Sequence, residues 1–226
     1  MTFLLYLALN LAVLSFAAYS ARIGGLRLYV ALWVLGIGAG MLNNMIEGVV
    51  FGVAPLAMVA GAIAMAAVSF AILAAIAILL TRQWRSGAIA PSGPPLTVMK
   101  LAAIVIAYEI LYFTAGTFVF PYVAPFYANI GLPSGASVIA LEVPRALLWV
   151  AFAWPFLRLA PRFVPLNLAL TYSVIGGIAP LVVDNPLMPL WVRIPHMIET
   201  STSNFLFGLF VGWLLTWRPR PAQVTA

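Results

Sequence analysis

A short stretch near the carboxyl end of this 226-residue chain holds its densest group of chemically useful side chains. His196 and Glu199 are three positions apart, and Ser203 follows Glu199 by four, with Asn204 next to it. Because residues three or four apart share one face of an α-helix, the spacing predicts a polar face with an imidazole–carboxylate pair. The alternative is a helix start, in which Pro195 opens the helix and the hydroxyls satisfy free backbone groups.

A second polar island lies inside an early apolar segment. Asn44 and Glu47 are three positions apart, and Asn43 and Glu47 are four apart. Asparagines alone would favour hydrogen bonds between membrane helices, which contribute about 0.6 kcal/mol each. The carboxyl group of Glu47 in the same island makes a binding site as well supported as interhelical hydrogen bonding. Ionisable groups inside a membrane normally face a partner or a water-filled cavity.

Glu109 is expected to be the most deeply placed acid in the chain, and Tyr112 lies three residues later on the same helical face. An unpaired carboxyl group in hydrocarbon favours its neutral form at pH 7. Such a group can carry a proton or act as a general acid. The competing interpretation is a carboxylate fixed in a structural ion pair.

Arg145 follows Glu142 by three positions, with Pro144 between them. This spacing favours a local salt bridge on one helix. A second interpretation is that the guanidinium group reaches across to Glu109 or Glu199, or holds an anionic lipid head group.

No metal or cofactor is expected. Cysteine is absent and a single histidine occurs, which excludes thiolate and multi-histidine metal sites within one chain. A carboxylate-rich divalent-metal site is a weaker alternative, for which the ligands would be Glu47, Glu109, His196 and Glu199. The phosphate-binding, zinc-protease, serine-hydrolase and dinucleotide-binding signatures do not occur.

The elements that must position these residues are transmembrane helices. The chain is 65% hydrophobic and 7% charged, whereas soluble domains carry about a quarter charged residues. Its mean hydropathy is +1.11. We therefore predict an all-α, polytopic membrane helix bundle that forms a single domain over residues 1–226. Its seven expected spans are about 3–20, 28–51, 55–80, 98–120, 137–157, 163–183 and 195–217.

The distribution of charge predicts the orientation of the bundle. With seven spans, nine basic residues fall on one side, and the positive-inside rule makes that side cytoplasmic. These nine are Arg22, Arg27, Arg82, Arg85, Lys100, Arg158, Arg162, Arg218 and Arg220. The N-terminus is then outside and the C-terminus cytoplasmic. No acid lies on the cytoplasmic side, and most acids are expected in the outer half of the bilayer.

The net charge of +6 is explained by this bias. No basic run is interleaved with aromatic residues, so a nucleic-acid partner is not expected. The first apolar stretch begins at Thr2 without a preceding basic region, which favours a retained span over a removed signal peptide. The expected location is a bacterial cytoplasmic membrane. Rhodopsin-like proteins need a lysine in the last span, but the only lysine here is Lys100.

Three functions remain open. The first is a transporter or channel for protons, cations or a small polar solute, with Glu109 as the central titrating group and Glu199 and His196 as an outer relay. In it Asn43, Asn44 and Tyr112 supply neutral hydrogen bonds. The second is an intramembrane enzyme acting on an outer-leaflet, lipid-linked substrate, with His196 and Glu199 as an acid–base pair and Arg145 holding the head group. The third is a structural or accessory subunit. The sequence predicts no oligomeric state.

Overall fold

The computed structural model describes residues 1–52, 54–85, 93–128, 131, 133–185 and 188–217, and within these ranges all regular elements are helices. Six helical stretches are long and apolar enough to cross a membrane. They are Thr2–Ser20 (α1), Leu26–Val50, Leu56–Leu80 (α4), Val98–Tyr127 (α5), Gly135–Leu157 (α6) and Val164–Val182. The expectation of an all-helical, multi-pass membrane protein is confirmed at this level.

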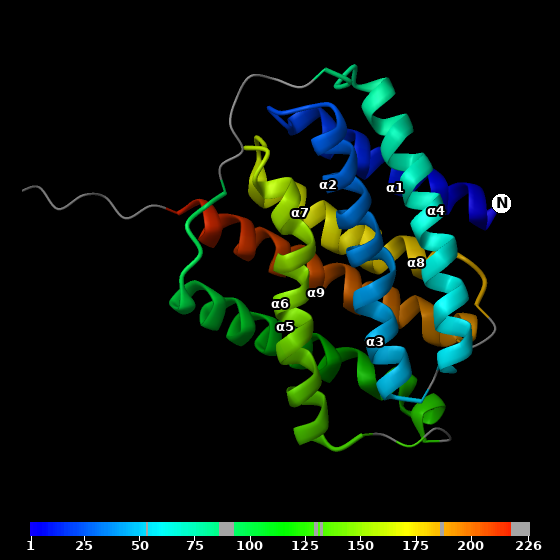
Figure 1. Ribbon diagram of the computed structural model, residues 1–226. Coiled ribbons are helices and arrows are strands. Elements are labelled where there is room, and N and C mark those ends of the chain that lie inside the picture. Colours follow the sequence, from blue (N-terminus) through cyan, green and yellow to red (C-terminus); the bar gives the residue numbers. More distant parts are fainter. Residues whose placement is uncertain (53, 86–92, 129–130, 132, 186–187, 218–226) are drawn as a thin grey trace, which may run out of the picture.

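The last expected span forms a 27-residue helix, α9 (Leu190–Thr216), which is less apolar than the other six. Its first half carries Arg193, His196 and Glu199, and these residues lower its hydropathy. The helix packs against α5 and against the stretch 164–178, so it lies inside the bundle. In Figure 1, the axes of α1, α5 and α9 have a similar tilt, with α5 antiparallel to the other two, while α4 and α6 cross them.

Two of the apolar stretches contain π-helical segments. The second is built from α2 (Leu26–Ile37), η1 (Gly38–Leu42) and α3 (Asn43–Val50). The sixth is built from α7 (Val164–Leu170), η2 (Thr171–Ile178) and α8 (Ala179–Val182). A π-helical turn accommodates one extra residue in an α-helix and occurs frequently at functional sites. Neither π-helical segment was predicted from the sequence.

The two π-helical segments pack against each other, and glycine makes this approach feasible. A Cβ atom at Gly176 would lie 3.2 Å from the carbonyl oxygen of Ala39 and 2.4 Å from the ring of Trp149. A Cβ atom at Gly40 would lie 3.2 Å from Ile175. Larger side chains at these glycines would therefore push the second and sixth apolar stretches apart.

Several helix ends meet at one end of the bundle, which we call the basic end (Figure 1). It contains the α1–α2 turn, the C-terminus of α4, the α6–α7 turn and the C-terminus of α9. Backbone hydrogen bonds join these parts: Arg22 N–H to Leu159 O at 3.2 Å, Gly25 N–H to Gln83 O at 2.7 Å and Arg162 N–H to Ser20 O at 2.8 Å. The side chain of Lys100 also donates to Leu215 O at 3.4 Å. Arg218 and Arg220 lie outside the described residues.

The hydrophobic core is concentrated in the half of the bundle near the basic end. In α1, every buried residue except Asn10 falls between Val13 and Ser20. In α4, every buried residue except Val59 falls between Ala66 and Ile78. The opposite half is packed less tightly, and it is there that the helices leave a cavity.

Candidate functional site

A cavity of about 510 Å³ occupies the half of the bundle opposite the basic end. Its polar and charged lining includes Asn44, Glu47, Tyr112, Arg145, His196 and Glu199. Ala54 and Asp184, which belong to connections at that end, also line it, and the side chain of Asp184 is 82% exposed. The cavity therefore opens to the surface at the end opposite the basic end.

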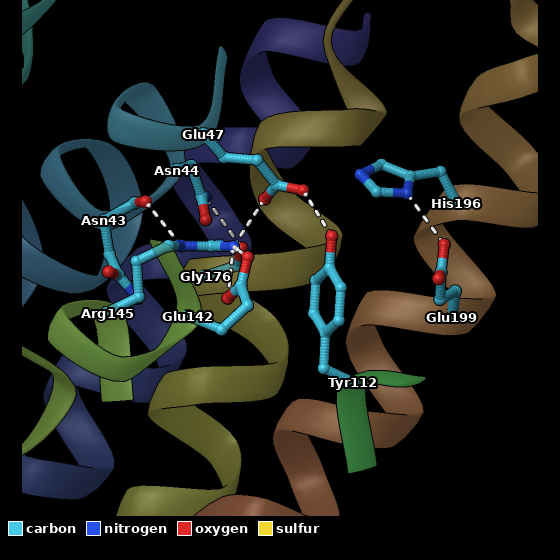
Figure 2. Close-up of polar contacts among 9 residues, drawn as sticks. All are labelled: Asn43, Asn44, Glu47, Tyr112, Glu142, Arg145, Gly176, His196 and Glu199. Atoms are coloured by element: carbon cyan, nitrogen blue, oxygen red, sulfur yellow. Dashed lines mark hydrogen bonds and ion pairs between the residues drawn. The ribbon is translucent and has the colours of Figure 1, made fainter. Parts of the chain in front are cut away.

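A buried ion triad forms one side of the cavity (Figure 2). Nη1 of Arg145 lies 2.7 Å from both carboxylate oxygens of Glu142 and 2.8 Å from Oε2 of Glu47. Nε of Arg145 donates to the backbone oxygen of Asn43 at 3.2 Å. The local Glu142–Arg145 pair expected from the spacing is confirmed. The partner on another helix is Glu47 on α3, and not Glu109 or Glu199 as considered from the sequence.

The charges in this triad do not cancel. Two carboxylates share one guanidinium group, so the group carries a net negative charge when both acids are ionised. Glu142 is fully buried and the Arg145 side chain is 5% exposed, whereas the Glu47 side chain is 19% exposed toward the cavity. Buried charges are tolerated only when they are paired and hydrogen-bonded, so the three groups stabilise one another as a unit.

Two hydrogen bonds tie α3, which carries Glu47, to the neighbouring walls of the cavity. The Tyr112 hydroxyl donates to Oε1 of Glu47 at 3.0 Å, which connects α5 to α3. Nδ2 of Asn44 donates to the carbonyl oxygen of Gly176 in η2 at 2.8 Å. The π-helical geometry of η2 shifts backbone bonding away from the α-helical pattern, and Gly176 presents its carbonyl group to a side chain.

Asn43 contributes to the site through its backbone rather than its side chain. Its side-chain oxygen and nitrogen are buried without a hydrogen-bond partner in the part of the chain that the structure describes. It does not line the cavity. An unsatisfied buried amide costs about 1–3 kcal/mol, so this position lowers the stability of the fold.

The opposite side of the cavity carries the imidazole–carboxylate pair expected from the sequence. Nδ1 of His196 lies 2.9 Å from Oε2 of Glu199, and both side chains are about one-fifth exposed or less. Figure 2 shows this pair on α9, with Tyr112 between it and the ion triad. A Cβ atom at Gly116 on α5 would lie 3.4 Å from Oε1 of Glu199, so the glycine leaves room for the carboxylate.

The interpretation of Pro195 as a helix start is wrong. The helix α9 begins at Leu190, so Pro195 lies in its second turn. The expectation that hydroxyls bond to the backbone is confirmed: Thr200 donates to His196 O and Ser203 to Glu199 O, both at 2.8 Å. Ser203 and Asn204 also line the cavity.

Glu109 lies outside the cavity lining. Both of its carboxyl oxygens are covered, and neither has a hydrogen-bond partner among the described residues. It lies on α5 seven residues before Gly116, which places the two positions on the same helical face, near α9. The structure therefore brings Glu47, Arg145, His196 and Glu199 together around one cavity. Glu109 does not line this cavity.

A layer of four buried aromatic rings closes the cavity toward the basic end. The ring centroids are 4.7 Å apart for Tyr108 and Phe207, 5.8 Å for Phe207 and Tyr172, and 4.4 Å for Tyr172 and Trp149. The Tyr172 hydroxyl donates to Trp149 O at 2.9 Å. We call these four residues the aromatic layer.

Helical geometry explains why the aromatic layer lies next to the site on the side of the basic end. Trp149 follows Arg145 by four residues, Phe207 follows Ser203 by four, and Tyr172 precedes Gly176 by four. In every case the ring is one helical turn closer to the basic end than the residue that lines the cavity. The layer therefore separates the polar site from the tightly packed half of the bundle.

Sequence reasoning missed the apolar walls and the aromatic layer. Phe3, Tyr6 and Met65 line the cavity, but nothing in the sequence distinguishes them from lipid-facing residues of the same type. The four-residue spacing between site residues and aromatic rings was visible in the sequence. It acquires meaning only after the site residues are known.

Within the described ranges, no three histidine or acidic side chains are grouped closely enough to hold a metal ion. No protein-family model, curated protein or solved structure matches the chain. The functional assignment therefore rests on the site itself.

Proposed function

We propose that the chain is a membrane transporter that takes protons, cations or a small polar solute into a cavity open to the outside. One observation carries this proposal: charged residues from several helices line a single cavity that is open at one end and closed by aromatic rings at the other. Such a cavity corresponds to one state of an alternating-access cycle, in which the site faces one side of the membrane at a time.

The proposal includes seven spans, with α9 as the seventh. At 1.5 Å per residue, its 27 residues extend about 40 Å, which is enough to cross a hydrocarbon core of about 30 Å. The basic end is then cytoplasmic by the positive-inside rule, and the cavity opens outward. The location remains a bacterial cytoplasmic membrane.

Cysteine labelling tests this topology, because the chain has no native cysteine. Arg85→Cys and Thr216→Cys lie at the basic end, and Ser134→Cys lies at the other end. An impermeant maleimide is expected to label the first two from the cytoplasmic side and the third from outside. Labelling of Thr216→Cys from outside would contradict a spanning α9.

The charge of the cavity favours cations. The ion triad carries one net negative charge when ionised, and Glu199 adds a carboxylate that is paired with His196. Carboxylates in a confined, water-poor space attract cations more strongly than they would in bulk water. The two π-helical segments meet at the cavity wall, and they are suitable places for the backbone adjustment that closing the site requires.

The His196–Glu199 pair is the observation that favours an enzyme as the second candidate. Two contacts weigh against it. The hydroxyls of Ser201 and Ser203 donate to backbone oxygens of their own helix, so neither is activated by His196. The guanidinium group of Arg145 is already paired with two carboxylates, which leaves little affinity for a substrate phosphate.

Flux measurements in proteoliposomes test the proposal. Gradients of protons, sodium and methylammonium are imposed in turn, and a saturable flux of at least one of them is expected. Glu47→Gln and Glu199→Gln should each lower that flux by about tenfold or more. Thr117→Ala serves as the control, since Thr117 is exposed on α5 and lies outside the cavity lining. Absence of flux, together with turnover of a lipid-linked substrate, would favour the enzyme.

A further inference from the structure

We propose that the ligand of this cavity is an amphiphile with an apolar body and one cationic head, and that it enters from the outer-leaflet lipid between α1 and α4. This inference rests on the proposed function and specifies its substrate class. It depends on three properties of the cavity: an apolar wall, an opening toward lipid and an excess of negative charge.

Most of the cavity wall is apolar, and its methionine side chains can adapt their conformation to a ligand. Aromatic rings and methionines cover the side formed by α1, the second apolar stretch and α4, with Phe3, Tyr6, Met41, Met45 and Met65 as its main members. Methionine adapts to ligands of irregular shape, and aromatic faces attract organic cations. A volume of about 510 Å³ is that of a site for a drug-sized molecule. A hydrated inorganic ion would gain nothing from this wall.

The wall is continuous with the lipid-facing surface of the bundle. Phe3 on α1 is 54% exposed and Met65 on α4 is 71% exposed, yet both also line the cavity. Met65 lies nine residues into α4, which is about 14 Å along the helix. In the proposed orientation, this depth lies within the hydrocarbon of the outer leaflet. Each leaflet contributes about 15 Å of hydrocarbon. An opening here contacts acyl chains rather than bulk water.

Within the ion triad, the negative charge is available to a ligand and the positive charge is not. His196, which also lines the cavity, is 21% exposed, but it is charged only when protonated and is paired with Glu199. Among the charged groups of the triad, the Arg145 side chain is 5% exposed and has two carboxylate partners, but Glu47 is 19% exposed. Glu199, at 16%, faces the same cavity. A cationic head would therefore meet carboxylate oxygens, and an anionic head would meet repulsion.

Binding of matched probes to the full chain in nanodiscs tests the charge and the apolar body together. Tetraphenylphosphonium and tetraphenylborate have nearly the same size and shape but opposite charge, and tetramethylammonium has the charge without the apolar body. We expect saturable binding of tetraphenylphosphonium above that of empty nanodiscs. The other two ions should bind at least about tenfold more weakly. Glu47→Gln and Glu199→Gln should each weaken tetraphenylphosphonium binding by a similar factor.

Equal binding of tetraphenylborate would overturn the proposal, because charge would then play no part. Binding and flux of tetramethylammonium or methylammonium without binding of tetraphenylphosphonium would also overturn it, while leaving the transport function standing. If none of the probes binds and no gradient drives flux, the transport function fails as well. The two proposals therefore fail in distinguishable ways.

The lateral route has its own test. Met65→Trp places a bulky ring at the opening between α1 and α4, whereas Val68→Trp adds the same ring at an exposed position of α4 outside the cavity lining. Stopped-flow binding of tetraphenylphosphonium is expected to be severalfold slower in Met65→Trp and unchanged in Val68→Trp. Equal association rates in the two variants would contradict entry between α1 and α4.

Discussion

The guanidinium group of Arg145 on α6 lies 2.8 Å from the carboxylate of Glu47 on α3, at the boundary between the buried core and the cavity. This contact determines which acid faces the cavity. Glu142 pairs with Arg145 on the same helix and is fully buried, while Glu47 pairs with the same guanidinium group and remains partly exposed. The arrangement gives the cavity a carboxylate held in a fixed position by a neighbouring buried charge.

Removal of the arginine alone should destabilise the protein strongly. Arg145→Met leaves the buried carboxylate of Glu142 without a partner, and breaking a buried pair in this way costs about 3–5 kcal/mol. The double variant Arg145→Met with Glu142→Gln removes both charges and should regain most of that loss. Unfolding in denaturing detergent measures the difference. A double variant as unstable as the single one would contradict the pairing.

The close packing of Gly176 in η2 against Trp149 on α6 and Ala39 in η1 predicts a sharp response to a single methyl group. Gly176→Ala would place a Cβ atom 2.4 Å from the Trp149 ring, so the packing must shift, at a cost of about 1–3 kcal/mol. Gly61→Ala is the matched control, because nothing lies within 4 Å of a Cβ atom there. Thermal unfolding should show a loss for Gly176→Ala alone. Equal stability of both variants would show that η2 does not pack closely against Trp149 on α6 and Ala39 in η1.

The aromatic layer is expected to act as the inner barrier of the cavity. Phe207→Ala removes the ring that contacts both Tyr108 and Tyr172, and it should raise non-saturable proton leak through proteoliposomes by several-fold. Phe207→Leu, which restores apolar volume, should leak less. Phe210→Ala on the same helix is the control, since Phe210 contacts Trp213 outside the layer. An identical proton leak in Phe207→Ala and Phe210→Ala would contradict the role of the aromatic layer as a barrier.

The fold class and several site contacts could be predicted from the sequence because they depend on local periodicity. Apolar runs of about 20 residues indicate spans, and a three-residue spacing brings Glu142 to Arg145 and His196 to Glu199. The contact between Glu47 and Arg145 was not predictable, because it depends on how two distant helices rotate against each other. The same holds for Glu109, which the spacing places on the helical face of Tyr112. The rotation of α5 decides that Tyr112 lines the cavity and Glu109 does not.

The π-helical segments and the exposed edge of the cavity at Met65 were also beyond sequence reasoning. A π-helical turn leaves no clear compositional signal in a segment that is apolar throughout. An exposed methionine such as Met65 looks the same in sequence whether it borders acyl chains alone or a cavity as well. Both features depend on three-dimensional packing.

In the proposed transporter, one cavity with a charged site opens to the outside and is closed toward the cytoplasm. Ser203→Cys places a thiol on the cavity wall in a chain that has no other cysteine. This thiol lies one helical turn farther from the basic end than Phe207. A membrane-impermeant maleimide should modify this thiol from the outer face of oriented vesicles and leave it unmodified from the inner face. Modification from the inner face alone would contradict the account.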